Sequence, residues 1–131
     1  MNSLTRMSFV VLMSLASVVS SYAKLIENPT AAEFNSLIAK GNVVVDFFAT
    51  WCGPCKRLGP VLHQIAEEPA FQSVTFIKLD VDKNPDLTQQ YGVRSMPTIL
   101  FFSNGKELSR SSGFNGKVAL ETSIRQQFGL K

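Results

Sequence analysis

The sequence predicts an α/β domain, in which a central mixed β-sheet carries helices on both faces. Long apolar segments rich in β-branched and aromatic residues alternate with segments of helical periodicity. An Asn-Gly pair separates the last two predicted strands, so these two strands run antiparallel. The 131 residues are 45% hydrophobic and 18% charged, as in one ordinary globular domain. The predicted order of elements is β-α-β-α-β-α-β-β-α.

The first predicted elements are a short edge strand at 24–27 and a helix that begins at Thr30. Glu33 follows Thr30 by three residues, so the two form a capping box, in which each side chain hydrogen-bonds to the other residue's backbone N–H. Gly41 is a plausible end for this helix. Residues 43–49 are almost continuously apolar, which predicts a central strand buried on both faces.

The next predicted helix begins at position 53 or 54 and runs to about 68, with Pro60 expected to kink it. Residues 74–80 form a second buried strand, and 84–92 form a short helix or turn. A third central strand at 98–102 precedes the Asn-Gly turn at 104–105, and 106–112 returns antiparallel. A C-terminal helix follows, with Leu120, Ile124 and Phe128 on one face and Gly129 at its end.

The first 23 residues have the pattern of a secretory signal peptide. A polar start containing Arg6 precedes an apolar run at 7–19, and Ser21 and Ala23 place small residues at the cleavage positions. We therefore expect cleavage after Ala23, a domain at 24–131 and export to the periplasm or the medium. The alternatives are an uncleaved anchor or a mis-set start codon, with the protein in the cytoplasm.

The formal net charge is +3, and the lysines and arginines are scattered apart from the adjacent Lys56 and Arg57. No basic run is interleaved with aromatic residues, so nucleic acid is not an expected partner. His63 lies among apolar helix residues and is interpreted as a structural or surface histidine. The charged set Asp80, Asp82, Lys83 and Asp86 is interpreted as a solvated turn, because no glutamate follows at the distance that a calcium loop needs.

Cys52 and Cys55 are the two cysteines, separated by Gly53 and Pro54. A Cys-x-x-Cys pair that follows a buried strand and opens a helix is typical of a redox site. The helix N-terminus stabilises a thiolate, so Cys52 is expected to be exposed and acidic. Cys52 would attack a substrate disulfide, and Cys55, one turn later, would resolve the mixed disulfide.

Three other interpretations compete with redox chemistry. A zinc site needs four ligands, but the chain offers two cysteines and one histidine, so no metal is expected. A structural disulfide would close a loop of only about four residues and gain little from loop entropy. Two inert buried thiols are disfavoured by their position at a helix start.

The chain resembles the thioredoxin family over essentially all of residues 25–128. A Cys-x-x-Cys pair alone would be a weak match, but here it lies within a longer run and is followed by four further matches in the family's order. These matches are Val45 to Lys56 with Trp51-Cys52-Gly53-Pro54-Cys55, then Tyr91-Gly92-Val93, Met96-Pro97-Thr98, Asn104-Gly105 and Gly113.

The resemblance implies the thioredoxin fold, with Pro97 in a cis peptide bond facing the disulfide. It also makes Asp46 the proton acceptor for Cys55 and Lys78 the partner of Asp46. From its residues alone, Asp46 could equally be an edge or a hydrogen-bonded core aspartate. Gly53, Pro54 and Lys78 are expected to tune the redox chemistry, and Trp51, Met96, Pro97 and Gly113 to contact substrate.

The function implied is that of a protein-disulfide reductase or dithiol electron carrier, with no cofactor beyond the Cys52–Cys55 disulfide. Its partners would be disulfide-containing proteins and an electron donor, either a thioredoxin reductase or a membrane dithiol donor, and the protein is expected to be a monomer. An exported oxidase or isomerase is disfavoured because position 54 is not histidine. A binding module that uses the surface around Pro97 is the alternative from a different class.

Overall fold

The computed structural model describes residues 25–131. Its regular elements follow the predicted order, with one additional turn of 3-10 helix at Pro69–Phe71. In chain order they are β1 (Leu25–Glu27), α1 (Ala31–Ile38), β2 (Asn42–Phe48), α2 (Gly53–Glu67), β3 (Val74–Asp80), α3 (Pro85–Gln90), β4 (Thr98–Ser103), β5 (Lys106–Ser112) and α4 (Lys117–Phe128).

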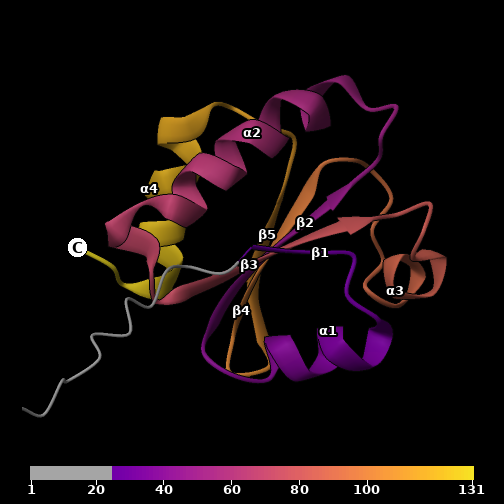
Figure 1. Cartoon of the computed structure of the whole chain (residues 1–131), viewed down its shortest axis with the longest axis horizontal. Coiled ribbons are helices and arrows are strands. Elements are labelled where there is room, and N and C mark those ends of the chain that lie inside the picture. Colours follow the sequence, from indigo (N-terminus) through magenta and orange to yellow (C-terminus); the bar gives the residue numbers. More distant parts are fainter. Residues whose placement is uncertain (1–24) are drawn as a thin grey trace, which may run out of the picture.

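The five strands form one mixed sheet in the order β1-β3-β2-β4-β5. β1 and β2 pair parallel with β3, whereas β4 pairs antiparallel with both β2 and β5. Helices α2 and α4 cover one face of the sheet, and α1 and α3 lie on the other (Figure 1). The predicted mixed sheet with helices on both faces is therefore confirmed.

The central position of β2 explains its almost continuous apolar sequence. Side chains alternate between the two faces of a strand, so both faces of a strand covered by helices must be apolar. Val43, Val45 and Phe47 belong to the core under α1, whereas Val44 belongs to the core under α2 and α4. Asp46, two positions after Val44, therefore points toward α2.

Local signals account for the ends of several elements. Thr30 caps α1 through the predicted capping box, since Thr30 N–H donates to Glu33 Oε2 at 2.7 Å and Glu33 N–H donates to Thr30 Oγ1 at 3.2 Å. Gly129 ends α4 in the left-handed conformation. Pro60 lies inside α2, which runs on to Glu67.

The predicted leader at 1–23 lies outside the described residues. Within residues 25–131, none of the helices has both the length and the apolar character needed to cross a membrane.

Candidate active site

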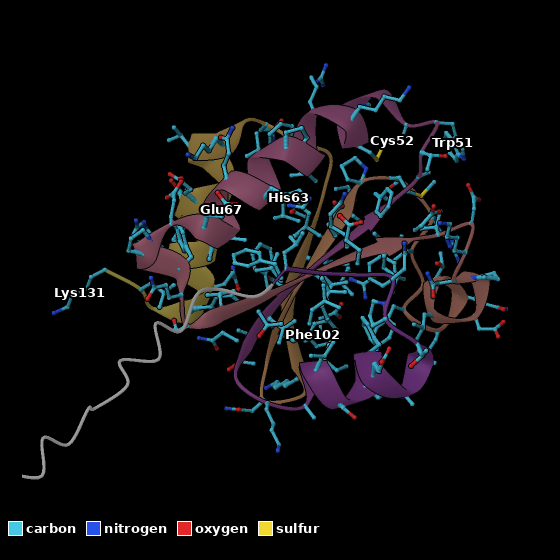
Figure 2. All side chains as sticks on the ribbon, viewed as in Figure 1. Trp51, Cys52, His63, Glu67, Phe102 and Lys131 are labelled. Carbon is cyan, nitrogen blue, oxygen red and sulfur yellow. A yellow bond between two sulfur atoms is a disulfide. The ribbon has the colours of Figure 1, made fainter. Side chains whose placement is uncertain are left out.

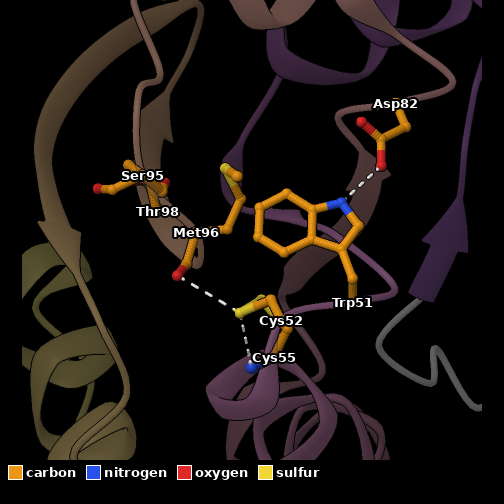
Figure 3. The surroundings of a disulfide bond; sticks show 7 residues. All are labelled: Trp51, Cys52, Cys55, Asp82, Ser95, Met96 and Thr98. Atoms are coloured by element: carbon orange, nitrogen blue, oxygen red, sulfur yellow. Dashed lines mark hydrogen bonds between the residues drawn. A yellow bond between two sulfur atoms is a disulfide. The ribbon is translucent and has the colours of Figure 1, made fainter.

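Cys52 and Cys55 form a disulfide at the N-terminus of α2 (Figure 3). Cys52 is the N-cap residue, and its Sγ accepts the backbone N–H of Cys55 at 3.3 Å. Pro54 lies in the first turn, where a missing N–H removes no helix hydrogen bond. The free N–H groups of this turn and the helix dipole would stabilise a thiolate at Cys52 once the disulfide is reduced.

The expectation that Cys52 is exposed is wrong. Only 5% of Cys52 is accessible, the same fraction as for Cys55. The reason is a loop distant in sequence, because Cys52 Sγ lies 3.4 Å from the backbone carbonyl oxygen of Met96. The two cysteines therefore differ in what their surroundings offer, and not in their exposure.

The loop that faces Cys52 contains the Met96–Pro97 peptide bond, which is cis as the resemblance implied. Two hydrogen bonds hold this loop in place. Thr98 Oγ1 donates to the carbonyl oxygen of Ser95 at 2.6 Å, and Gly113 N–H donates to the carbonyl oxygen of Pro97 at 2.9 Å. Gly113, which follows β5 and is itself exposed, thus supports the Pro97 carbonyl and lies beside the other predicted substrate-contacting residues.

Trp51 is 66% exposed and stands beside Cys52 (Figure 3). Its indole Nε1–H donates to Asp82 Oδ2 at 3.0 Å. Sequence reasoning placed Asp82 in a solvated turn and missed this contact, because a single aspartate 31 positions away carries no signal of it. The same interpretation is wrong for Asp80, which is buried and whose Oδ1 accepts the N–H of Asp82.

Asp46 is completely buried, and within the described residues neither of its carboxylate oxygens has a hydrogen-bond partner. It lies on the central strand β2, so neither an edge position nor a hydrogen-bonded core site describes it. Burial raises the pKa of the Asp46 carboxyl from 3.8 to about 7, and the charge on Lys78 opposes that rise. A carboxyl of this kind can take up or release a proton near neutral pH.

Lys78 is the register partner of Asp46 on the neighbouring strand β3. Its ammonium forms an ion pair with Glu27 of β1, with 3.5 Å between Nζ and Oε1. The Nζ atom also lies 4.7 Å from the centre of the Phe48 ring. Lys78 and Asp46 are thus neighbours in the sheet register, but Lys78 forms its ion pair with Glu27.

A groove of about 410 Å³ is lined in part by Cys55, which is itself buried. Residues of the loop before α2, of α2 itself and of β3 line it, among them Cys55, Lys56, Gly59, His63 and Lys78. Cys55 therefore faces a groove that contains the Lys78 side chain, whereas Cys52 faces the Met96 backbone. Because their surroundings differ, the two cysteines can have different chemical roles.

His63 is on the surface, as predicted from its sequence, and its Nε2 lies 3.3 Å from Glu27 Oε1. In the described part of the chain, no three side chains of His, Cys, Asp or Glu gather as ligands for a metal ion. A second hollow, of about 480 Å³, extends from Met96 over Val81, Asp82 and Arg94. It continues the surface on which Trp51 and Met96 flank Cys52.

A redox-active cysteine pair at the start of a helix, facing a cis-proline loop on a mixed sheet, defines a thiol–disulfide oxidoreductase. The comparisons with known proteins agree. The family model described as Thioredoxin matches residues 25–126, and the chain belongs to the thioredoxin family. It is a dithiol protein-disulfide reductase.

Several thioredoxins are close in sequence. The thioredoxin of Chlamydia muridarum is 51% identical over 87 residues, which are 66% of this chain and 83% of that protein. Thioredoxin-2 of Saccharomyces cerevisiae is 48% identical over 88 residues, with the same coverage of 66% and 83%. A bifunctional thioredoxin reductase/thioredoxin of Mycobacterium leprae is 46% identical over 93 residues, 70% of this chain and 20% of that protein.

Solved structures agree on the fold. The thioredoxin of Malassezia sympodialis superposes with a TM-score of 0.72 at 37% identity, covering 80% of this chain and 91% of that one. A mutant thioredoxin from Halobacterium salinarum gives a TM-score of 0.74 at 31% identity, covering 83% of this chain and 95% of that one.

The predicted export is corrected by these comparisons. The relatives that the chain matches, from Chlamydia and yeast, are cytoplasmic thioredoxins. Cleavage after Ala23 falls on residues outside the described part of the chain and stays an untested prediction.

Proposed function

We propose that Cys52 is the nucleophile of this reductase, that Cys55 is the resolving thiol and that Asp46 accepts the Cys55 proton. The observation that supports these roles best is that the two sulfurs have different neighbours. Cys52 Sγ adjoins the Met96 backbone and the exposed Trp51, whereas Cys55 adjoins the groove that contains Lys78.

In the first step, the Cys52 thiolate of the reduced protein attacks one sulfur of a substrate disulfide. The substrate S–S bond breaks, a Cys52–substrate mixed disulfide forms, and the other substrate sulfur leaves as a thiolate that takes a proton from solvent. The N–H of Cys55, which lies 3.3 Å from Cys52 Sγ, stabilises the attacking thiolate.

In the second step, the Cys55 thiol gives its proton to the Asp46 carboxylate and attacks Cys52 Sγ. The mixed disulfide breaks, the second substrate sulfur leaves as a thiolate that takes a proton from solvent, and the Cys52–Cys55 disulfide forms, which is the state seen in the structure. A pKa of about 7 suits Asp46 to this exchange, because its carboxylate is basic enough to accept a thiol proton and can return it to solvent at neutral pH.

The surface around Cys52 supplies the contacts with substrate in this proposal. Trp51 and Met96 flank the nucleophile, and Pro97, joined to Met96 by the cis bond, would present its backbone edge to substrate. Gly113 positions Pro97 through their hydrogen bond. Gly53 and Pro54 shape the turn between the sulfurs and so tune the stability of the disulfide against the dithiol.

The domain that carries out this chemistry runs from 24 to 131, and we propose that it works as a monomer, without nucleic acid and with no cofactor besides its disulfide. Family members act on disulfide substrates and accept electrons from thioredoxin reductase. The same type of reductase is the donor proposed here. A membrane dithiol donor was expected only for an exported protein, so it is not proposed here.

Insulin reduction by the full chain tests the function directly. The wild-type protein with a dithiol donor should reduce insulin catalytically, whereas Cys55→Ser should lose turnover because the mixed disulfide is no longer resolved. Equal insulin reduction by Cys55→Ser and wild type, or no reduction by either, would favour a binding module in which the cysteine pair is incidental.

A further inference from the structure

Three charged side chains occupy paired positions on three adjacent parallel strands. Glu27 of β1 pairs with Lys78 of β3, and Lys78 pairs with Asp46 of β2. Register partners on parallel strands point to the same face of a sheet, so the three side chains form one row beneath α2. The row runs from the half-exposed Glu27, through the largely buried Lys78 side chain, to the fully buried Asp46.

Lys78 is the one cation in this row, and the row has two carboxylates. In the structure Lys78 Nζ forms an ion pair with Glu27 Oε1 at 3.5 Å, while the Asp46 oxygens have no hydrogen-bond partner among the described residues. The Lys78 Nζ atom lies 4.7 Å from the centre of the Phe48 ring, and a Cβ built on Gly59 of α2 would lie 3.6 Å from it, which is an ordinary van der Waals contact. The ammonium is therefore packed against Phe48 and α2, while its charge acts on the Asp46 carboxyl as well as on Glu27.

Glu27 is itself fixed from a second side. The same Oε1 atom that binds Lys78 lies 3.3 Å from Nε2 of His63, on α2. Contacts from β3 and from α2 therefore converge on one oxygen and hold it at the outer edge of the sheet. This arrangement gives Glu27 a position that an exposed glutamate at a strand end would not otherwise keep.

We propose that Glu27 is a positioning residue for the reductase, which holds Lys78 Nζ away from Asp46 and so keeps the Asp46 carboxyl able to exchange a proton near neutral pH. This inference rests on the role proposed above for Asp46. It follows from electrostatics, because a cation that moves toward a carboxylate favours the charged form and lowers the pKa of the carboxyl. A carboxylate with a strongly lowered pKa would be a poor acceptor for the Cys55 proton.

In the described part of the chain, other charged and titratable groups lie on the elements that surround Asp46. From α2, Cys55, Lys56 and His63 line the groove that also holds Lys78. From β3, Asp80 ends the strand and is held by the N–H of Asp82. From β4, the register partner of Asp46 is the apolar Ile99. Lys78 is thus the cation whose position can change most at Asp46 when Glu27 is altered.

The test is an NMR titration of the Asp46 carboxyl in the full chain with its disulfide intact, so that no thiol titrates. Protein labelled with ¹³C at aspartate carboxyls would be followed from about pH 4 to about pH 10, and the Asp46 signal assigned by its loss in Asp46→Asn. Glu27→Gln should lower the Asp46 pKa by roughly 0.5 to 1 unit, because Lys78 is released toward Asp46. Lys78→Met should raise it.

The double variant Glu27→Gln/Lys78→Met separates positioning from a direct effect of the Glu27 charge. With Lys78 absent, Glu27→Gln should leave the Asp46 pKa within about 0.2 units of the Lys78→Met value. Glu67→Gln, which removes a glutamate charge at the far end of α2 (Figure 2), is the matched control and should leave the Asp46 pKa unchanged.

An unchanged pKa in Glu27→Gln, or an equal shift with and without Lys78, would overturn the proposal. The pH dependence of insulin reduction tests the proposed function separately. If the carboxyl shifts in Glu27→Gln and the pH profile does not, Glu27 positions Lys78 as proposed and Asp46 is not the proton acceptor.

Discussion

The indole Nε1–H of Trp51 donates to Asp82 Oδ2 at 3.0 Å and so fixes a large, mostly exposed ring beside the redox disulfide. When a partner protein covers an exposed aromatic ring, the burial of its large apolar area favours binding. The contact therefore holds an apolar ring in place for substrate, and Asp82, its partner, lines the hollow that extends from Met96.

Trp51→Ala should lower kcat/KM for insulin reduction by at least about fivefold, which is the loss of an interface contact worth about 1 kcal/mol. Asp82→Ala, which leaves the ring in place without its anchor, should cause a smaller loss. Val118→Ala removes an exposed apolar side chain from α4 and should leave insulin reduction unchanged. A loss in Val118→Ala as large as in Trp51→Ala would remove the specific role assigned to the ring.

Asp46 makes the stability of the protein depend on pH. Its pKa of about 7 in the folded protein lies above the value of 3.8 expected when the chain is unfolded. The folded state therefore binds the proton more tightly, and stability falls as the pH rises from about 4 to about 7, by up to about 4 kcal/mol.

Asp46→Asn should remove this loss. Urea unfolding of the oxidised proteins should show Asp46→Asn more stable than wild type at about pH 8 and nearly equal to it at about pH 4. The same variant should resolve mixed disulfides more slowly, since its amide accepts no proton. Equal stability curves at both pH values would mean that Asp46 is not desolvated in solution.

Gly113 has a φ of +83°, a conformation that costs an L-residue about 1–2 kcal/mol, and its N–H holds the Pro97 carbonyl. Gly113→Ala should lower the free energy of unfolding by about that amount and also lower insulin reduction, because the loop facing Cys52 loses its support. No atom lies within 4 Å of a Cβ built on either Gly113 or Gly53, but Gly53 has no positive φ. Gly53→Ala is therefore the matched control for stability, and equal unfolding of the two variants would show that backbone strain at Gly113 is absent.

Local sequence signals predicted most of the fold. The strand at Val74–Asp80 and the strand after the Asn104-Gly105 turn have the predicted bounds, because β-branched runs and an Asn-Gly pair act within a few residues. The 3-10 turn at Pro69–Phe71 was missed. It has no periodic pattern of its own, and its one buried side chain, Phe71, is held by tertiary packing.

The sequence predicted the cysteine pair of the candidate site but not the contacts that surround it. The burial of Cys52 depends on Met96, 44 positions away, and the ion pair of Lys78 depends on Glu27, at the far edge of the sheet. Neither contact can be predicted from neighbouring residues in the sequence, because each joins segments that only the assembled sheet brings together. The lack of a partner for Asp46 among the described residues has the same origin, because only the assembled sheet shows what a buried carboxylate meets.

Cys52 and Cys55 have different roles in the proposed mechanism, and trapping of mixed disulfides measures that difference. Cys52→Ser and Cys55→Ser proteins would each be incubated with a disulfide-containing substrate, and the covalent complexes counted by mass spectrometry under non-reducing conditions. We expect that Cys55→Ser accumulates a Cys52-linked complex and that Cys52→Ser accumulates none. Accumulation in Cys52→Ser and not in Cys55→Ser would contradict it and reverse the two roles.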